Sequence, residues 1–247
     1  MANKNCKYKI LIFDLDDTLI DNKENVKHAF KEMLKLRNIE YSDSEFSRWY
    51  EIDKQFWEDR QDGLIEIPND LKNEEGKKSK KILDWLRAQR IIRYFSGEIE
   101  LDDAINLNSV FIDSMSEVVT AIDGAYEILE YLSKQYKILI ATNGPEKVMH
   151  EKLVKIDCLK FIDEVLSAEM FGYMKPDERF FDGIQCMLNN FNDNEYLIIG
   201  NSLKSDVGFG MNCGFDSCWF DRKEEVLTTT YNPTMVIEKL TDLFNIL

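Results

Sequence analysis

The chain has 247 residues, 44% of them hydrophobic, which is ordinary for a protein with an apolar core. This length suits one core domain carrying a substantial insert better than two full domains. The formal net charge of −15 argues against a nucleic-acid polymer or an anionic membrane surface as the partner. A site for an anionic ligand must therefore be built locally, from a metal ion, a lysine and main-chain amides.

Cysteine and histidine usage narrows the kind of site and the compartment. The five cysteines are dispersed without a CxxC pair: Cys6, Cys158, Cys186, Cys213 and Cys218. Such a set is typical of reduced thiols in a cytosolic protein, and two histidines argue against a histidine-based zinc site. The N-terminus shows no signal-peptide pattern and no apolar run has spanning length. We therefore expect a cytoplasmic protein, either a monomer or a homodimer.

The first predicted element is a strand over residues 8–13, where the sequence is YKILIF. A short, nearly continuous apolar run of this kind is typical of a strand buried on both faces of a parallel sheet. The run ends at Asp14, the first of several carboxylates. Their place at a strand end makes this segment the starting point for a candidate site.

Residues 21–116 have a different hydrophobic pattern from the first strand, because charged, amphipathic segments replace continuous apolar runs. We predict a helical insert here, with residues 66–79 as its most loop-like part because they contain Pro68 and Gly76. The expected helices cover residues 25–36, 44–62, 78–94 and 101–119. The core would then consist of residues 1–20 and 117–247.

Strand patterns return after the insert. The two strong ones cover residues 136–141 and 196–199, weaker ones are expected near 164–167 and 217–220, and a helix is predicted at 233–244. Alternating strands and helices indicate an α/β core with a parallel sheet. In such sheets the ligand crevice lies beyond the carboxyl ends of the strands, so the polar clusters that end these strands should meet in one site.

The strongest chemical signal is the segment from Asp14 to Thr18, DLDDT. Asp14 and Asp16 project close together, and two neighbouring carboxylates need a cation or a shared proton. Mg²⁺ suits such oxygen ligands. One carboxylate can act as a nucleophile that is transiently phosphorylated, and the other can transfer protons. An EF-hand calcium loop is excluded, because its sixth and twelfth positions hold Leu19 and Asn25 instead of Gly and Glu.

Three further clusters follow, each with a simpler structural explanation beside the functional one. Thr142 to Gly144 offers a hydroxyl and amides for phosphate, but also suits a helix cap. Lys175, which precedes Pro176, can neutralise phosphate charge or serve as an ordinary surface lysine. Asn201 and Asp206, after the strand at 196–199, can bind a metal or cap a helix. Their joint occurrence at strand ends, in this order, favours the functional explanation.

These four clusters resemble the four motifs of the haloacid dehalogenase-like hydrolase superfamily, subfamily IA, and the likeness spans nearly the whole chain. Further short segments resemble the YjjG/YfnB-type pyrimidine 5'-nucleotidases within it: Phe56 to Glu58, Gly63, Ser167 to Glu169, Tyr173 to Asp177, and Trp219 with Phe220. The resemblance implies a Rossmann-like core with an inserted α-helical, C1-type cap. It also implies a Mg²⁺-dependent phosphatase acting on small phosphate esters, with nucleoside monophosphates as the expected substrates.

The resemblance also implies residue roles. Asp14 would be the nucleophile and Asp16 the general acid and base. Thr142, Asn143 and Lys175 would hold the substrate phosphate. The Mg²⁺ ligands would be Asp14, the main-chain carbonyl of Asp16, and a residue of the last cluster, Asn201 or Asp206.

One departure from the family pattern is Asn201, where the motif usually has Asp. An amide oxygen can bind Mg²⁺ but brings no charge, so metal binding should weaken, and a catalytically impaired phosphate-binding or regulatory protein stays open as an alternative. A phosphosugar mutase is also open, because mutases retain the carboxylate of Asp16. Candidate substrate contacts in the insert are Trp49, Phe56, Trp57, Arg60, Trp85 and Arg87.

Overall fold

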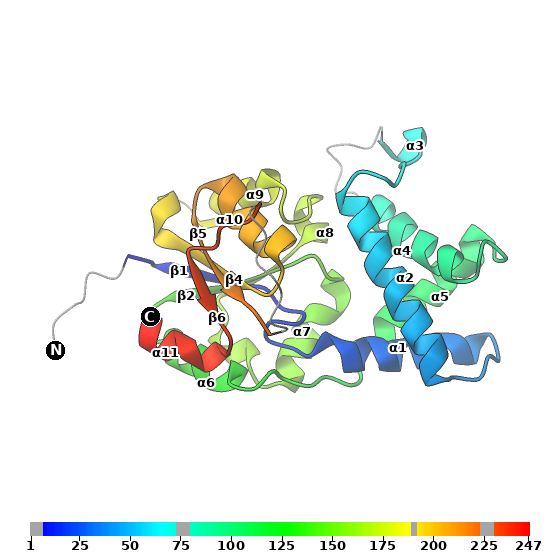
Figure 1. Cartoon of the computed structure of the whole chain (residues 1–247), viewed down its shortest axis with the longest axis horizontal. Coiled ribbons are helices and arrows are strands. Elements are labelled where there is room, and N and C mark those ends of the chain that lie inside the picture. The colour runs from blue at the N-terminus through cyan, green and yellow to red at the C-terminus, as the bar shows by residue number, and fades with distance from the viewer. Residues whose placement is uncertain (1–6, 73–79, 189–191, 223–229) are drawn as a thin grey trace. The chain divides into compact units, whose positions relative to one another are not determined.

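The structure is a computed structural model, and it describes residues 7–72, 80–188, 192–222 and 230–247 (Figure 1). Contacts within the chain divide it into two compact units. Unit 1 comprises residues 1–22 and 119–247, and unit 2 comprises residues 23–118. No helix within the described ranges combines the length and the apolar character needed to cross a bilayer.

Unit 1 is built on a six-stranded sheet in the order β3-β2-β1-β4-β5-β6, and every pairing is parallel. The strands are β1 (Ile10–Phe13), β2 (Lys137–Thr142), β3 (Glu164–Ser167), β4 (Tyr196–Gly200), β5 (Asp216–Phe220) and β6 (Met235–Ile237). All four residues of β1 are buried, as the continuous apolar run predicted. The predicted α/β class with a parallel sheet is confirmed.

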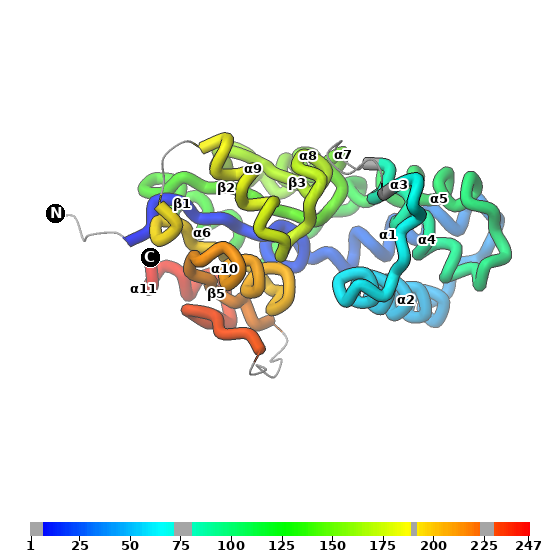
Figure 2. Tube along the Cα trace, turned by 90° about the horizontal axis from the view of Figure 1, so that it is seen from above, coloured from blue at the N-terminus to red at the C-terminus, as the bar shows by residue number. Residues whose placement is uncertain are grey.

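Helices cover both faces of this sheet. Leu11 and Phe13 of β1 join a core cluster with residues of α6 (Ala125–Leu132) and α11 (Leu243–Ile246), and these two helices lie side by side in both views (Figures 1 and 2). On the other face, α10 (Gly208–Cys213) packs against Ile198 of β4. The remaining helices of unit 1 are α7 (Glu146–Lys155), α8 (Ala168–Phe171) and α9 (Glu178–Leu188).

Unit 2 is helical and has an aromatic core of its own. Its helices are α1 (Asn22–Leu36), α2 (Asp43–Gln61), α3 (Asn69–Lys72), α4 (Lys80–Tyr94) and α5 (Leu101–Ser114). The fully buried ring of Trp49 stacks on Phe30 at 5.4 Å between centroids and meets Tyr94 and Phe111 edge-on or tilted. These rings supply the apolar area that holds α1, α2, α4 and α5 together.

Three predicted elements need correction or qualification. The helix predicted at 233–244 is wrong, because residues 235–237 form β6 beside β5 and helix α11 starts only at Leu243. A three-residue apolar segment, MVI, gains more by completing the sheet edge than by joining a helix. The segment 66–79, predicted to be the most loop-like part, contains the short helix α3, and its residues 73–79 lie outside the described residues. The helix predicted at 78–94 is confirmed as α4 from residue 80 onward.

The helix predicted at 101–119 ends earlier, at Ser114, and the chain re-enters unit 1 at Val119. Ile20 pairs with Ala121 in an antiparallel bridge. The amide of Asp21 donates to the carbonyl of Thr120 at 2.9 Å, and that of Ile122 donates to Leu19 at 2.9 Å. The two segments by which the chain leaves and re-enters unit 1 are therefore hydrogen-bonded to each other.

Candidate active site

Asp14 lies at the carboxyl end of the central strand. It directly follows β1, and its amide donates to the carbonyl of Ile199 in β4 at 2.9 Å. β1 lies between β2 and β4, where the chain switches from building one side of the sheet to building the other. Open α/β sheets bind ligands at such a switch point. The ends of the three neighbouring strands thus bring Asp14, Thr142 and Asn201 to one edge.

Lys175 connects two carboxylates of this edge. Its Nζ donates to Oδ1 of Asp14 at 2.8 Å and to Oδ1 of Asp206 at 2.6 Å. The three residues are buried, with Lys175 and Asp206 each 1% exposed. Burial alone would lower the pKa of the Lys175 ammonium, but Asp14 and Asp206 raise it above its usual value. The lysine therefore stays charged.

The negative charge of Asp14 is less well stabilised by its surroundings than the positive charge of Lys175. Burial raises the pKa of its carboxyl to about 7, and the neighbouring Asp206 and Asp16 carboxylates add to this rise while Lys175 opposes it. Carboxylates that crowd together in this way are stabilised by a cation. The electrostatics of the site therefore favour positive charge beside Asp14, from a metal ion or from Lys175.

Asp206 and Asn201 are held close to Asp14 by a network of short contacts. Oδ2 of Asp206 accepts from the amide of Ser202 at 3.0 Å. The Thr18 hydroxyl lies 3.2 Å from Oδ2 of Asp14 and 3.3 Å from Oδ1 of Asn201, so its single proton serves one of these oxygens at a time. The Trp219 indole Nε1 donates to the carbonyl of Asn201 at 3.0 Å. The amide side chain and the main chain of Asn201 are both fixed.

The position of the Asp206 side chain also explains why residue 200 is a glycine. The side chain of Asp206 packs on Gly200, where a Cβ would lie 2.3 Å from Cγ of Asp206. Such a distance is far inside van der Waals contact. Gly200 is needed for the close approach of this carboxylate to the strand end.

Thr142 and Asn143 have different surroundings. Oγ1 of Thr142, a buried residue at the end of β2, accepts from the amide of Gly144 at 2.9 Å. The Asn143 side chain accepts from the amide of Lys175 at 2.8 Å and donates to the carbonyl of Lys175 at 3.0 Å. Both ends of the Asn143 amide are therefore occupied by the main chain of Lys175. The side chain of Asn143 fixes the loop that carries the lysine.

Asp16 has a partner that the sequence analysis missed. Oδ1 of Asp16 accepts from Nζ of Lys152, a buried residue of α7, at 2.7 Å. The sequence did contain a signal, since Lys152 occupies a helix face otherwise formed by Val148, Met149 and Leu153. A lysine at an apolar position of an amphipathic helix is unusual without a buried acidic partner.

The donor set suits a hard dication. Among the described residues, no three His, Cys, Asp or Glu side chains form a metal-binding cluster. A Mg²⁺ site here would therefore draw on the carboxylates of Asp14 and Asp206, the amide oxygen of Asn201 and a main-chain carbonyl. All of these are the oxygen ligands that Mg²⁺ prefers, and Mg²⁺ commonly takes only one or two carboxylates. The residues present fit the ion.

The predicted substrate contacts in unit 2 divide into two groups. Trp49, Phe56 and Arg87 are buried in that unit, and Trp49 belongs to its aromatic core. Trp57, Arg60 and Trp85 are half-buried. Burial leaves the second group as the better candidates for contact with a ligand.

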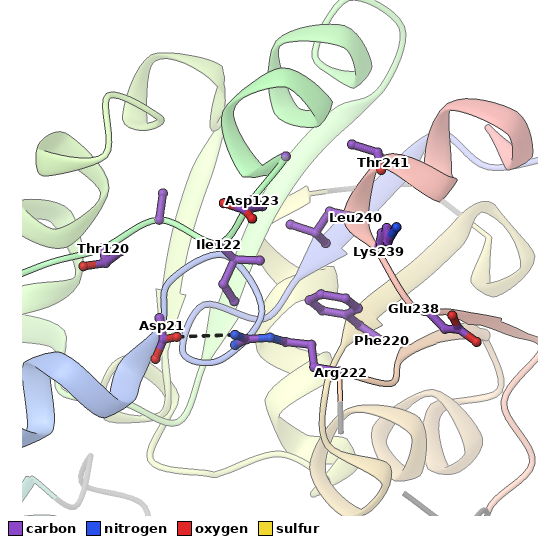
Figure 3. Close-up of a pocket in the computed structure, with 12 residues that line it drawn as sticks. Asp21, Thr120, Ile122, Asp123, Phe220, Arg222, Glu238, Lys239, Leu240 and Thr241 are labelled. Atoms are coloured by element: carbon purple, nitrogen blue, oxygen red, sulfur yellow. Dashed lines mark hydrogen bonds and ion pairs between the residues drawn. The ribbon is translucent and has the colours of Figure 1, made fainter. Parts of the chain in front are cut away.

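A pocket of about 460 Å³ lies elsewhere in unit 1, and its lining does not include Asp14, Asp16, Thr142 or Lys175. Figure 3 shows the Arg222 side chain in this pocket reaching toward Asp21, with a separation of 3.3 Å between Nη2 and Oδ2. This pocket and the cluster of strand-end carboxylates thus do not coincide.

Comparison with known proteins gives a consistent match. Residues 8–214 match the family model of the haloacid dehalogenase-like hydrolases. The sequence is 25% identical to the HAD-hydrolase YfnB of Bacillus subtilis, 26% identical to the pyrimidine 5'-nucleotidase PynA of Streptococcus pneumoniae and 24% identical to the pyrimidine 5'-nucleotidase YjjG of Escherichia coli. Each of these matches covers at least 95% of this chain and at least 95% of the relative. A crystal structure of YfnB bound to magnesium superposes with a TM-score of 0.83, at 23% identity, and the match covers 97% of this chain and 98% of YfnB.

Proposed function

This chain belongs to the haloacid dehalogenase-like hydrolase family, and we propose that it is a Mg²⁺-dependent phosphatase of small phosphate monoesters with Asp14 as its nucleophile. The observation that carries the proposal is the buried Asp14 carboxylate at the end of β1, joined through Lys175 to Asp206. A carboxylate at a sheet edge, with a fixed ammonium beside it, suits attack on an anionic phosphoryl group.

In the proposed reaction, an Asp14 oxygen attacks phosphorus while the bond from phosphorus to the ester oxygen breaks. Asp16 gives a proton to that leaving oxygen. Water then attacks the phosphorus of the aspartyl-phosphate, Asp16 takes its proton, and inorganic phosphate leaves as the Asp14 carboxylate is regenerated. Thr142, the main-chain amide of Asn143 and Lys175 would hold the phosphate oxygens, with the Asn143 side chain fixing the main chain of Lys175.

The residues that would hold the ion are Asp14, the main-chain carbonyl of Asp16, Asn201 and Asp206. When bound, Mg²⁺ supplies positive charge that lets two anions, the carboxylate and the phosphate ester, approach one another. Lys175 adds a second positive charge at the same place.

For the substrate, we propose a pyrimidine nucleoside monophosphate such as UMP. The support is the full-length similarity to PynA and YjjG, both pyrimidine 5'-nucleotidases. Residues 1–20 and 117–247 would form the catalytic core, and residues 21–116 the cap that selects the substrate. The half-buried Trp57 and Trp85 of the cap could stack on a base. The dispersed cysteines support a reducing, cytoplasmic location.

A second candidate function rests on Asn201. If the uncharged amide leaves the ion too weakly bound, the protein would bind phosphate esters without turning them over. This alternative keeps the same site but assigns it a binding or regulatory role.

The test is phosphate release from a panel of nucleoside monophosphates, sugar phosphates and p-nitrophenyl phosphate, with Mg²⁺ and with a chelator. We expect chelator-sensitive release, fastest with UMP, and loss of release with every substrate in Asp14→Asn. Binding of UMP without release from any ester at high Mg²⁺ would favour the second function. Isomerisation of a sugar phosphate without phosphate release would indicate a mutase.

A further inference from the structure

Lys152 is a buried lysine on an otherwise apolar helix face. Val148, Met149 and Leu153 share this buried face of α7. The Lys152 side chain is 1% exposed, and its Nζ lies 2.7 Å from Oδ1 of Asp16. The lysine therefore reaches from a core position of α7 to the second carboxylate of the DLDDT segment.

The packing of α7 does not require a charge here. An apolar side chain of similar length would avoid the desolvation of the ammonium, and replacing a buried ion pair in this way is often neutral or stabilising. Asp16 keeps 20% of its side chain exposed, so water could solvate its carboxylate without Lys152. The pair is therefore explained better by where it holds Asp16 than by what it adds to the fold.

The two oxygens of Asp16 have different surroundings. Oδ1 is occupied by Lys152. Oδ2 lies beside Gly144, where a Cβ would approach it to 2.9 Å. Oδ2 takes no hydrogen bond from any residue in the part of the chain that the structure describes. One oxygen is anchored and the other is left for a proton.

We propose that Lys152 is a positioning residue for proton transfer, because it anchors Oδ1 of Asp16 so that Oδ2 exchanges the proton with the leaving oxygen. This inference rests on the proposed phosphatase function. As the Asp14–phosphorus bond forms and the phosphorus–ester oxygen bond breaks, Oδ2 gives its proton to the ester oxygen. As water attacks and the Asp14–phosphorus bond breaks, Oδ2 takes the proton back. Lys152 itself exchanges no proton.

The acidity of the leaving group separates this role from a purely structural one. Phenol, like the tyrosine side chain, has a pKa of about 10, so phenolate leaves poorly without a proton. The much more acidic p-nitrophenol leaves readily as its anion. Because kcat/KM covers the steps up to cleavage of the ester bond, a misplaced Asp16 should lower kcat/KM for phenyl phosphate and UMP far more than for p-nitrophenyl phosphate.

The experiment measures kcat and KM of Lys152→Met on these three esters. We expect kcat/KM to fall about 100-fold on phenyl phosphate and UMP, mainly through kcat, and less than about threefold on p-nitrophenyl phosphate. Lys152→Arg keeps the charge and should recover most of the loss. Asp16→Asn should reproduce the same selectivity for leaving groups. Lys155→Met, which changes an exposed lysine at the end of the same helix, is the matched control and should behave as the wild type.

Equal losses on all three esters, or no loss on any, would overturn the role of Lys152. Thermal melting establishes whether each variant is folded, and if Lys152→Met is not, Lys152→Gln is compared on the same esters by the same criterion. Failure of the proposed function gives a different pattern, since wild-type protein would then release no phosphate from any ester, and the inference would fall with it.

Discussion

The contact between Gly200 and Asp206 makes the substitution Gly200→Ala informative. The new Cβ would lie 2.3 Å from Cγ of Asp206, whereas carbon atoms in contact lie about 3.5–4.0 Å apart. Asp206 would have to retreat by about 1 Å. It cannot do so and keep both its 2.6 Å bond to Lys175 and its 3.0 Å bond to the amide of Ser202.

The expected loss of stability combines two effects. Overpacking a core typically costs about 1–3 kcal/mol, and breaking a buried ion pair about 3–5 kcal/mol, so we expect a loss of at least about 4 kcal/mol, the sum of the two lower values. For a chain of this size, that corresponds to a fall in Tm of about 10 °C. Displacement of the site by about 1 Å should also lower kcat/KM about 100-fold.

The assay is thermal denaturation together with phosphate release, and Gly208→Ala is the matched control. A Cβ at Gly208 would meet Tyr231 at 3.4 Å and Pro176 at 3.5 Å, which is ordinary contact. Gly208 has helical backbone geometry, and alanine there should be neutral or stabilising by up to about 1 kcal/mol. A Gly200→Ala protein with a Tm within about 2 °C of the wild type and an unchanged kcat/KM would refute the reasoning.

Three further predictions concern single residues. Asn201→Asp adds a charge to the proposed metal ligands, so the Mg²⁺ concentration for half-maximal phosphate release should fall about tenfold; identical Mg²⁺ curves would contradict this. Asn143→Ala removes two hydrogen bonds from the main chain of Lys175, so denaturant unfolding should show a loss of about 1–3 kcal/mol in the free energy of unfolding. An unchanged free energy of unfolding together with an unchanged kcat would contradict the role of the Asn143 side chain in holding the Lys175 loop. Burial raises the pKa of Cys158 to about 11, so iodoacetamide at about pH 8 should modify exposed Cys186 in native protein and spare Cys158, as peptide mass spectrometry can determine.

The sheet was predictable because its strands carry their own signal. The runs before Asp14, Thr142 and Gly200 are almost continuously apolar, as is typical of strands covered on both faces. β6 was not predictable in the same way, because its three residues become a strand only through pairing with β5. Short edge strands depend on their neighbours more than on intrinsic propensity.

The candidate site shows the same division between local and non-local signals. The sequence singled out Asp14, Thr142 and Lys175 from their places relative to strands. It could not show that the Asn143 side chain holds the main chain of Lys175, since that contact joins residues 32 positions apart. Lys152 was detectable in principle, as a charge on an apolar helix face, but its partner Asp16 lies 136 positions away.

The pairing of Ile20 with Ala121 has a consequence for how the length and sequence of unit 2 can change in evolution. Because the outgoing and returning segments are fastened to each other within unit 1, the ends of residues 23–118 start and finish at neighbouring points. The entropy of closing a loop grows only slowly with its length, so the segment between these points can be lengthened, shortened or exchanged at small expense to the rest. The sequence and length of unit 2 can thus vary in evolution without displacing the strand-end carboxylates of unit 1.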